Sequence, residues 1–370
     1  MTLRDYQQEA VSFLVPRRRG FVVAPAGAGK TVIAAQAASR VCRPGWVVHW
    51  LANTIEQVQQ AEAAIGRTEG AEGVTFKVSC VAALPSLADA NLVIVDEAHH
   101  TPAATWMSTL QSIPPTAVLW GLSATPFGDD PIRNASVELA FAEFFKIDRA
   151  RIEASGHLIK GAVTVYDLDR YGEFDDEIDA ATAVETARRC RCFPSIPRFE
   201  HERRAAWQIT QEKVQANAAR NAAVIQLATA MSAAGESVLV LVHSIEHGQR
   251  LAELIPNAAC VYSKLPKKKR AELIEGLRSG SLTVLVATSL ADEGLDVPRA
   301  SRLILVAGGR SAGKLEQRAG RVLRPFEGKN GGLIFDFLDR GARFAHAQAR
   351  ARIAVYEKLG YNPKIISLAS

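Results

Sequence analysis

Short apolar runs alternate with stretches of helical periodicity along most of the 370-residue chain. Runs of four to six apolar residues without polar alternation are typical of parallel strands that are buried on both faces. We predict strands at residues 21–24, 46–51, 76–80, 92–95 and 117–122, and again at 237–242, 258–262, 283–287, 302–306 and 332–337. The chain is too long for one ordinary core, so we expect two α/β domains with parallel sheets, at residues 1–150 and 151–370.

The segment between the two blocks, about residues 167–234, differs from both and is predicted to be a largely helical connector. Residues 167–179 carry seven acidic side chains, which predicts an exposed loop. Residues 188–204 are basic, and residues 203–234 contain neither Gly nor Pro and are rich in Ala, which favours helix. The strand-like run Gly161–Leu168 is expected to join the second sheet.

Composition limits the class of protein only loosely. The chain is 48% hydrophobic and 22% charged, as in a globular protein, and it contains no apolar window long enough to span a bilayer. The first ten residues lack the pattern of a signal peptide, so we expect a cytoplasmic protein without a membrane partner. The net charge of +5 is compatible with nucleic-acid binding but is also common among ordinary enzymes. The five cysteines lack the paired spacing of a zinc site.

The first predicted strand leads directly into PAGAGKT, residues 25–31. Counted from Ala24, this segment is a phosphate-binding loop of the form AxxxxGKT, with Ala in the place of the usual first Gly. Lys30 would reach the β- and γ-phosphates of ATP, and the hydroxyl of Thr31 would ligate Mg²⁺. A plain small-residue loop is disfavoured because GKT falls at a strand–helix junction. The candidate nucleotide-binding residues are Ala26, Gly27, Ala28, Gly29, Lys30 and Thr31.

The strand at residues 92–95 ends in DEAHH, residues 96–100. In a parallel sheet this strand end would lie beside the phosphate loop, where Asp96 would hold Mg²⁺ and Glu97 would orient and deprotonate the attacking water. Both histidines could be ordinary surface residues. We predict a coupling role for His99, with His100 the weaker candidate.

Together these motifs resemble those of the superfamily 2 helicases and translocases, most closely the DEAH-type DNA motors. That group includes phage helicases, transcription-repair helicases and the motor subunits of restriction enzymes. LRDYQ, residues 3–7, is similar to the adenine-recognition element of the family, which implies that Arg4 and Gln7 contact the base. LSATPF, residues 122–127, resembles the motif that links hydrolysis to nucleic-acid binding, which implicates Ser123 and Thr125.

Two further resemblances lie in the second domain. VATSLADEGLDVP, residues 286–298, is similar to the fifth helicase motif, which implies nucleotide contacts from Gly294 and Asp296. EQRAGRVLRP, residues 316–325, matches QRxGRxxR and places Gln317, Arg321 and Arg324 opposite the phosphates. An arginine supplied by a second domain would neutralise charge on the transferred phosphoryl group and make hydrolysis depend on domain closure.

Nucleic-acid contacts are less well defined by the motifs. The resemblance implies backbone contacts from Asn53 and Thr54 after the second strand and from the region of Thr288. Two basic runs, Lys264 with 267–270 and the group Arg188, Arg189 and Arg191, are explained equally well by solvated helix faces or by phosphate binding. Trp106 and Trp120 are predicted to be packing residues rather than platforms for base stacking.

The resemblance implies two tandem RecA-like domains that bind ATP and Mg²⁺ in the cleft between them. We therefore predict a nucleic-acid-stimulated ATPase that acts as a DNA helicase or translocase and works as a monomer. DNA is favoured over RNA because DEAHH with QRAGRVLR differs from the usual motifs of the RNA-unwinding DEAD-box group.

Three alternatives stay open. The protein could be an RNA helicase, or it could translocate without separating strands. It could also be an ATP-controlled clamp or the motor subunit of a larger complex such as a restriction system, in which case a partner would have to supply the nuclease. A plain P-loop kinase is disfavoured because it would not need the motifs of the second domain.

Overall fold

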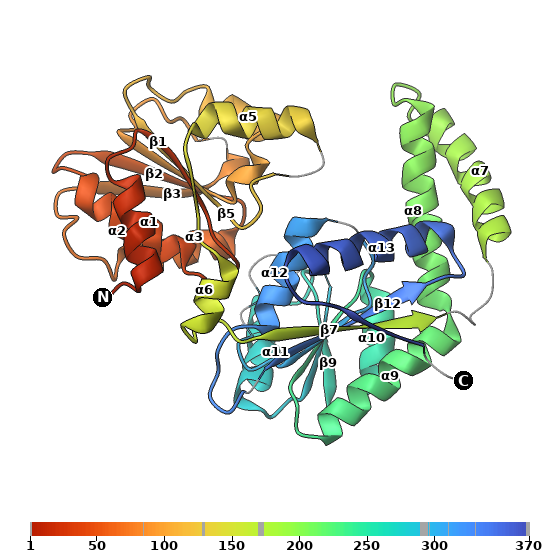
Figure 1. Cartoon of the computed structure of the whole chain (residues 1–370). Coiled ribbons are helices and arrows are strands. Elements are labelled where there is room, and N and C mark those ends of the chain that lie inside the picture. The colour runs from red at the N-terminus through yellow and green to blue at the C-terminus, as the bar shows by residue number, and fades with distance from the viewer. Residues whose placement is uncertain are drawn as a thin grey trace. The chain divides into compact units, whose positions relative to one another are not determined.

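The structure of the protein is a computed structural model. It describes residues 2–83, 85–127, 130–168, 174–288, 295, 297–309, 311–329 and 331–367, without the side chains of Glu56 and Thr105. The chain divides into two compact units, Met1–Leu158 and Ile159–Ser370, which Figure 1 shows in red to yellow and in yellow-green to blue. Within the described ranges, no helix is both long and apolar enough to cross a membrane.

The first unit is built on a parallel sheet in which six strands are described, in the order β3-β2-β4-β5-β1-β6. The strands are β1 (Arg19–Val23), β2 (Val47–Ala52), β3 (Thr75–Cys80), β4 (Leu92–Asp96), β5 (Val118–Ser123) and β6 (Phe144–Lys146). The helices of this unit are α1 (Asp5–Leu14), α2 (Lys30–Val41), α3 (Ile55–Ile65), α4 (Ala104–Leu110), α5 (Pro131–Phe141) and α6 (Arg149–Ala154), with short 3₁₀ turns η1 (Val81–Ala83) and η2 (Ala98–His100).

Both faces of this sheet are buried, and β4 shows why its sequence is apolar throughout. Leu92 and Ile94 pack into one cluster, which includes residues of α1 and α2. Val93 and Val95 point to the opposite face and pack into a second cluster with Trp106 of α4. Because successive side chains of a strand alternate between faces, burial on both sides requires an unbroken apolar run.

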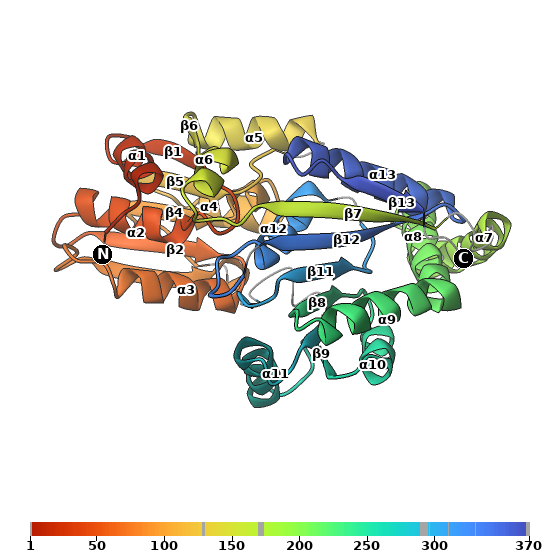
Figure 2. The ribbon, with the colours of Figure 1, turned by 60° about the horizontal axis from the view of Figure 1, so that its bottom comes forward.

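The second unit also has a parallel sheet, in which seven strands are described, in the order β13-β7-β12-β11-β8-β10-β9. Figure 2 shows β7, β12 and β11 side by side. The strands are β7 (Gly161–Leu168), β8 (Val238–Leu241), β9 (Ala258–Val261), β10 (Val284–Ala287), β11 (Arg302–Leu305), β12 (Gly332–Asp339) and β13 (Lys364–Ser367). The helices are α7 (Asp175–Cys192), α8 (Arg198–Ala216), α9 (Ala218–Ala233), α10 (Ile245–Leu254), α11 (Lys267–Ser279), α12 (Ala312–Val322) and α13 (Arg343–Lys358).

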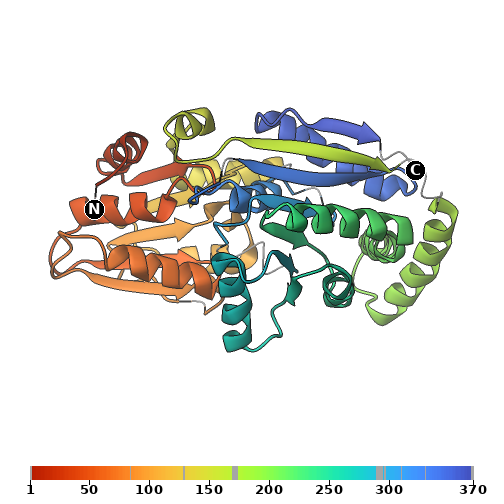
Figure 3. The same ribbon diagram turned by 90° about the horizontal axis from the view of Figure 1, so that it is seen from below.

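Helices cover both faces of this second sheet as well. Residues of α9 and α10 pack on Val238 and Val240 of β8, and α9 can be followed along that face in Figure 3. Leu239 and Leu241 face the other way, into a cluster with residues of α11, α12 and α13. The prediction of two α/β domains with parallel sheets is therefore confirmed, and all ten strands predicted from apolar runs are present.

The segment that follows β7 corrects one prediction. As expected, β7 joins the second sheet, between β12 and β13. Residues 175–179 are not loop, however, because α7 begins at Asp175. Its first turn holds Asp175, Asp176 and Glu177, and negative charge is stabilised there by the unpaired N–H groups at a helix N-terminus. α7 and α8 then form a helical hairpin (Figure 1).

The predicted helix over residues 203–234 is present but divided. Asn217 ends α8 and caps α9, because its side-chain oxygen accepts a hydrogen bond from the N–H of Arg220 at 2.9 Å. Asparagine is among the preferred residues at this capping position, so the break has a local cause even without Gly or Pro.

Candidate active site

The phosphate loop lies between β1 and α2. Gly27 and Gly29 have φ values of 88° and 83°, a left-handed conformation that favours glycine. α2 begins at Lys30, directly after Gly29. The loop therefore has the backbone turn and the helix N-terminus that bind phosphate in proteins. The ammonium group of Lys30 donates to the carbonyl of Ala24 at 3.3 Å, which holds it at the loop.

Gln7 supports this loop from the neighbouring helix α1. Its side-chain amide donates to the carbonyl of Ala28 at 3.0 Å, and its oxygen accepts from the N–H of Arg4 at 3.1 Å. A Cβ atom added at Gly29 would lie 2.5 Å from Nε2 of Gln7, so any larger residue there would displace the amide of Gln7. The guanidinium of Arg4 donates to the hydroxyl of Tyr6 at 2.8 Å. Arg4 and Gln7 thus adjoin the loop, and their predicted contact with adenine stays a prediction.

The two acidic residues of DEAHH are buried at the end of β4. Asp96 is 6% exposed and Glu97 is 8% exposed. Glu97 has φ 49° and ψ 49°, a left-handed conformation that costs a non-glycine residue of order 1–3 kcal/mol. Its N–H donates to a carboxylate oxygen of Asp96 at 3.0 Å. The two carboxylates are therefore buried next to each other at the end of β4.

The positive charge near this pair is too small to stabilise both carboxylates in the ionised form. Burial, reinforced by the negative charge of Glu97, raises the pKa of Asp96 to about 6. Burial also opposes ionisation of Glu97, but the charge of Lys30 and a hydrogen bond from His99 outweigh it and hold the pKa of Glu97 at about 2. Lys30 acts on both carboxylates, which places the phosphate loop and the acidic pair at one site.

This donor set fits Mg²⁺. A hydroxyl from Thr31 and a carboxylate from Asp96 are hard oxygen ligands, which Mg²⁺ prefers. The raised pKa of Asp96 indicates that a further cation would be favourable there, because one lysine serves two buried carboxylates. The residues present are therefore compatible with the metal that the resemblance implies.

A hydrogen-bond network joins Glu97 to the end of β5. Ser123 is fully buried, and its hydroxyl donates to Glu97 Oε2 at 3.4 Å. The hydroxyl oxygen of Ser123 lies 2.8 Å from Nδ1 of His99 and accepts from the N–H of Thr125 at 3.2 Å. His99 Nδ1 also lies 3.4 Å from Glu97 Oε2. The three residues predicted to couple hydrolysis to nucleic-acid binding are thus brought together around Glu97. The ring of His100 lies against that of His99, with centroids 4.0 Å apart and planes tilted by 39°.

The predicted nucleotide residues of the second unit are only partly described. Gly294 and Asp296 lie outside the described residues. Gln317 and Arg321 are on α12, and Arg324 follows the end of that helix. Arg321 is 8% exposed and donates to the carbonyl of Leu295 at 2.7 Å. Their roles toward ATP stay predictions.

Of the predicted nucleic-acid contacts, Thr54 has a clear local structural role. The hydroxyl of Thr54 caps α3 by accepting from the N–H of Gln57 at 3.3 Å. Gln57 Oε1 in turn accepts from the N–H groups of Asn53 at 2.9 Å and Thr54 at 3.2 Å. Thr288 follows β10 and is 6% exposed. The cap explains the residue type at position 54 without reference to a ligand. Nucleic-acid binding by Asn53, Thr54 and Thr288 stays a prediction.

Trp106 and Trp120 are 3% and 0% exposed, which confirms that they are packing residues.

No sequence pattern singles out Trp207, which is half-buried on α8 and packs edge-on against His243. The basic pair Arg203 and Arg204 just before it was the one available signal of a binding surface. The sequence does not show which elements pack beside this helix.

The fold and this site define a class of protein with two parallel-sheet α/β domains, the first of which has a phosphate loop beside a buried acidic pair. Solved structures with the same fold include the restriction-modification enzyme LlaBIII bound to DNA (TM-score 0.68, 15% identity, 100% of this chain and 32% of that one). They also include the helicase domain of Pyrococcus furiosus Hef (TM-score 0.54, 15% identity, 96% of this chain and 98% of that one). The first is named as an ATP-dependent enzyme and the second as a helicase domain. At these identities the likeness establishes the fold alone.

Sequence comparisons point to helicases. The profile described as "Helicase conserved C-terminal domain" matches residues 219–325, and that of an "AAA domain" matches residues 2–121. "Putative helicase 22" of Sulfolobus islandicus filamentous virus is 32% identical over 262 residues, 68% of this chain and 43% of the viral protein. "Putative DNA 3'-5' helicase Rad25" of Halobacterium salinarum is 27% identical over 376 residues, 95% of this chain and 57% of that protein. The chain spans about half the length of these curated relatives. The comparisons support a superfamily 2 helicase core.

Proposed function

We propose that the protein is a nucleic-acid-stimulated ATPase that acts as a superfamily 2 DNA helicase or translocase, more narrowly of the DEAH type. The observation that carries the proposal is the junction of β1, β4 and β5. There Lys30 of the phosphate loop acts on the buried carboxylates of Asp96 and Glu97, and Glu97 is linked to His99 and Ser123. A structural ion pair would need no phosphate loop and no such link.

The proposed roles follow from the chemistry of each group. Lys30 binds the β- and γ-phosphates, and the loop N–H groups from Ala26 to Gly29 bind the phosphate oxygens. Thr31 and Asp96 would hold Mg²⁺, which when bound neutralises charge on the phosphates. The carboxylate of Glu97 orients the attacking water and accepts its proton. His99, Ser123 and Thr125 transmit the state of this site to the nucleic-acid surface.

The second unit would contribute the remaining contacts. We propose that Gln317, Arg321 and Arg324 bind and stabilise the charge of the transferred phosphoryl group, as a guanidinium does in other phosphoryl-transfer enzymes. Gly294 and Asp296 would contact the nucleotide. Arg4 and Gln7 would bind adenine, and Gln7 would do so while it supports the loop at Ala28.

DNA is the proposed track. The Halobacterium relative is named as a DNA 3'-5' helicase, and that match extends over 95% of the present chain. We extend both the substrate and the direction of movement to this protein. Asn53, Thr54 and Thr288 are the proposed contacts to the nucleic-acid backbone.

The test is ATP hydrolysis by the wild type, Lys30→Ala and Glu97→Gln, each without nucleic acid and with single-stranded DNA, duplex DNA or RNA. We expect stimulation that is greatest with DNA. Lys30→Ala should lose turnover together with ATP affinity. Glu97→Gln should bind ATP normally and lose turnover by roughly 10²–10⁴-fold, because the amide keeps the shape but cannot accept the proton.

Lys77→Ala is the matched control, since Lys77 is a half-exposed lysine of the same unit that pairs with Asp89. Wild-type turnover that ignores every nucleic acid would overturn the proposal, and greater stimulation by RNA would overturn the choice of DNA. A strand-displacement assay on a duplex with a 3' overhang then separates a helicase from a translocase.

A further inference from the structure

A cavity of about 920 Å³ opens in the second unit, at the carboxyl ends of two neighbouring strands. Val242 and His243 follow β8, and Ala307–Gly309 follow β11. The chain leaves β8 toward β9 on one side of the sheet and later returns to form β11 on the other side. In open α/β sheets, ligands bind outside the carboxyl ends of the strands where the strand order reverses in this way. The position alone marks the cavity as a candidate binding site.

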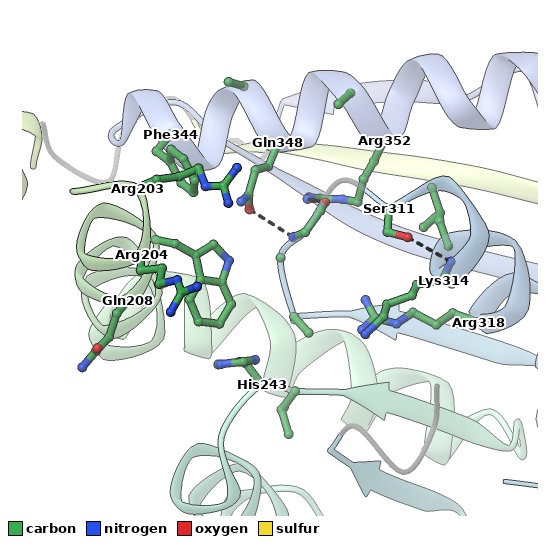
Figure 4. A pocket seen from close by; sticks show the side chains of 18 of the residues that line it. Arg203, Arg204, Gln208, His243, Ser311, Lys314, Arg318, Phe344, Gln348 and Arg352 are labelled. Atoms are coloured by element: carbon green, nitrogen blue, oxygen red, sulfur yellow. Dashed lines mark hydrogen bonds between the residues drawn. The ribbon is translucent and has the colours of Figure 1, made fainter. Parts of the chain in front are cut away.

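The walls of the cavity are cationic. In Figure 4, Arg203 and Arg204 extend from α8 on one side, and Lys314 and Arg318 extend from α12 on the other. No Asp or Glu is among the described residues that line the cavity. Arg204 pairs with Glu200 at 3.2 Å outside the lining, while Arg203 is exposed and has no ion-pair partner among the described residues. A cavity lined by one sign of charge attracts a ligand of the opposite sign.

Aromatic side chains also line the cavity. The rings of Trp207 and His243 pack edge to face, with centroids 4.5 Å apart and an angle of 89° between the planes. Phe344 of α13 also lines the cavity. A ligand that combines negative charge with a flat aromatic ring would match both features, since bases stack on aromatic side chains while their phosphates pair with Arg and Lys.

The loop of Ala307–Gly309 is held in place from α13. The N–H of Gly309 donates to Gln348 Oε1 at 3.0 Å, and the carbonyl of Gly309 accepts from Arg352 at 3.0 Å. Arg352 is itself fixed by two bonds to buried Asp336, at 2.8 and 2.9 Å. A Cβ atom at Gly308 would lie 2.9 Å from Gln211 and 3.0 Å from Gln348, so the loop packs closely against both side chains. A site that is already ordered loses little entropy when it binds.

We propose that this cavity binds a short segment of single-stranded nucleic acid, with a base on Trp207 and the flanking phosphates on the cations of α8 and α12. The inference rests on the proposed function and extends it, because it assigns a strand contact to the helical hairpin and to a surface of α12. A strand is favoured over a free nucleotide because the cations stand on opposite walls. A terminal phosphate group would instead be surrounded by donors at one point, as in the loop at residues 26–31.

The first test measures affinity for a fluorescent oligothymidylate by anisotropy over a range of salt concentrations, without ATP. The double variant Arg203→Ala/Arg204→Ala changes two exposed side chains and should fold normally. We expect its affinity to fall about tenfold or more, and the slope of log affinity against log salt to become shallower by about 0.7 for each phosphate contact removed. Trp207→Ala should weaken binding about 5- to 100-fold, with Trp207→Phe restoring most of it.

Arg350→Ala is the matched control, because Arg350 is an exposed cation of α13 that does not line the cavity. It should bind the oligonucleotide as the wild type does. Hydrolysis of ATP without nucleic acid should be the same in all of these variants, since none of the residues belongs to the proposed ATP site. A photoreactive iodouracil in the oligonucleotide should cross-link to the peptide that contains Trp207.

Wild-type affinity in the double variant, or a cross-link that maps elsewhere, would overturn the inference while leaving the proposed function intact. Thymidine monophosphate that competes as well as the oligonucleotide would overturn the assignment to a strand and favour a free nucleotide. If the wild type binds the oligonucleotide through these residues but ATP hydrolysis does not respond, the proposed motor function fails and the binding site stands.

Discussion

The hydroxyl oxygen of Ser123 lies 2.8 Å from Nδ1 of His99. Because this hydroxyl donates its one proton to Glu97 Oε2 at 3.4 Å, it accepts from His99, which places the imidazole proton on Nδ1. The N–H of Thr125 donates to the same oxygen at 3.2 Å. One buried serine therefore connects the proposed catalytic base to the loop after β5 and to the histidine after β4. A change in the position of either segment would therefore alter the hydrogen bonds around Glu97.

Replacing Ser123 with Ala should separate ATP turnover from its stimulation. Ala fits the buried space but removes the acceptor shared by His99 and Thr125. We expect ATP binding and unstimulated hydrolysis within a few fold of the wild type, and a stimulated rate lowered by about 10- to 100-fold, as for loss of a hydrogen bond to a charged group. Steady-state hydrolysis at saturating DNA measures this. Ser136→Ala is the control, because the hydroxyl of Ser136 bonds only within α5, to the carbonyl of Ile132. Undiminished stimulation in Ser123→Ala would count against the coupling role.

Apolar patterning predicted most strands because burial on both faces leaves an unmistakable run, as in Leu92–Asp96 of β4. It missed the strands that are not buried on both faces. β6 (Phe144–Lys146) is too short to show a pattern, and β13 (Lys364–Ser367) is exposed along its whole length at the sheet edge. The acidic start of α7 was interpreted as loop because stabilisation of charge at a helix N-terminus leaves no apolar periodicity.

Local motifs located the candidate ATP site because a phosphate loop needs a contiguous set of residues. They could not show that Glu97 has a left-handed backbone or that Ser123 joins it to His99, since β4 and β5 are far apart in the chain. The cavity beside Trp207 was beyond sequence patterns for the same reason. Its walls come from α8, α12 and α13 and from the ends of β8 and β11, so no single stretch of sequence carries its signature.

Gly29→Ala should abolish ATP binding with a limited loss of stability. The added methyl group would lie 2.5 Å from Nε2 of Gln7 and would have to displace the amide that supports the phosphate loop at Ala28. Binding of a fluorescent ATP analogue measures the loss.

Gly45→Ala provides a close control for this change. Gly45 has a φ of 87°, so alanine there is strained to a similar degree, yet nothing lies within 4 Å of the added atom. Both variants should lower the melting temperature by a similar amount, and Gly45→Ala should bind ATP normally. Equal ATP affinity in the two variants would show that the contact with Gln7 is unimportant.

Asp336→Asn should strongly destabilise the second unit. Asp336 is 1% exposed and Arg352 is 4% exposed, and they join β12 to α13 through two hydrogen bonds, with a third to Asp336 from the hydroxyl of Tyr356 at 3.0 Å. Removing the negative charge leaves a buried guanidinium uncompensated, which costs about 3–5 kcal/mol. Urea unfolding measures the change in free energy.

An exposed ion pair of the same unit sets the scale for that measurement. Glu275 accepts from Arg278 at 3.0 Å on the surface of α11. Glu275→Gln should cost less than about 1 kcal/mol, because water screens this pair. If Asp336→Asn is no more damaging than Glu275→Gln, the buried pair contributes little to stability.

The stability of the second unit should fall between pH 7 and pH 5 because of His247. Burial, together with the positive charges of Arg220 and Arg250, lowers the pKa of His247 to about 4. The ring is 6% exposed, and its Nε2 lies 2.9 Å from Oδ1 of Asn221, which suits a neutral imidazole that donates there. In the unfolded chain the histidine takes up a proton near its ordinary pKa of 6.5. The unfolded state therefore binds more protons below that pH, and stability decreases as the pH falls.

Between pH 7 and pH 5 this proton uptake should lower the free energy of unfolding by about 2 kcal/mol. Urea unfolding at pH 7, 6 and 5 measures it. His247→Gln keeps a donor for Asn221 and removes the titration, so the difference in stability between pH 7 and pH 5 should shrink by that amount, although the variant is less stable at pH 7. Carboxylates that titrate in the same range act on both proteins alike and cancel in the comparison. Identical pH profiles for the two proteins would mean that His247 is protonated as easily in the folded protein as in the unfolded chain.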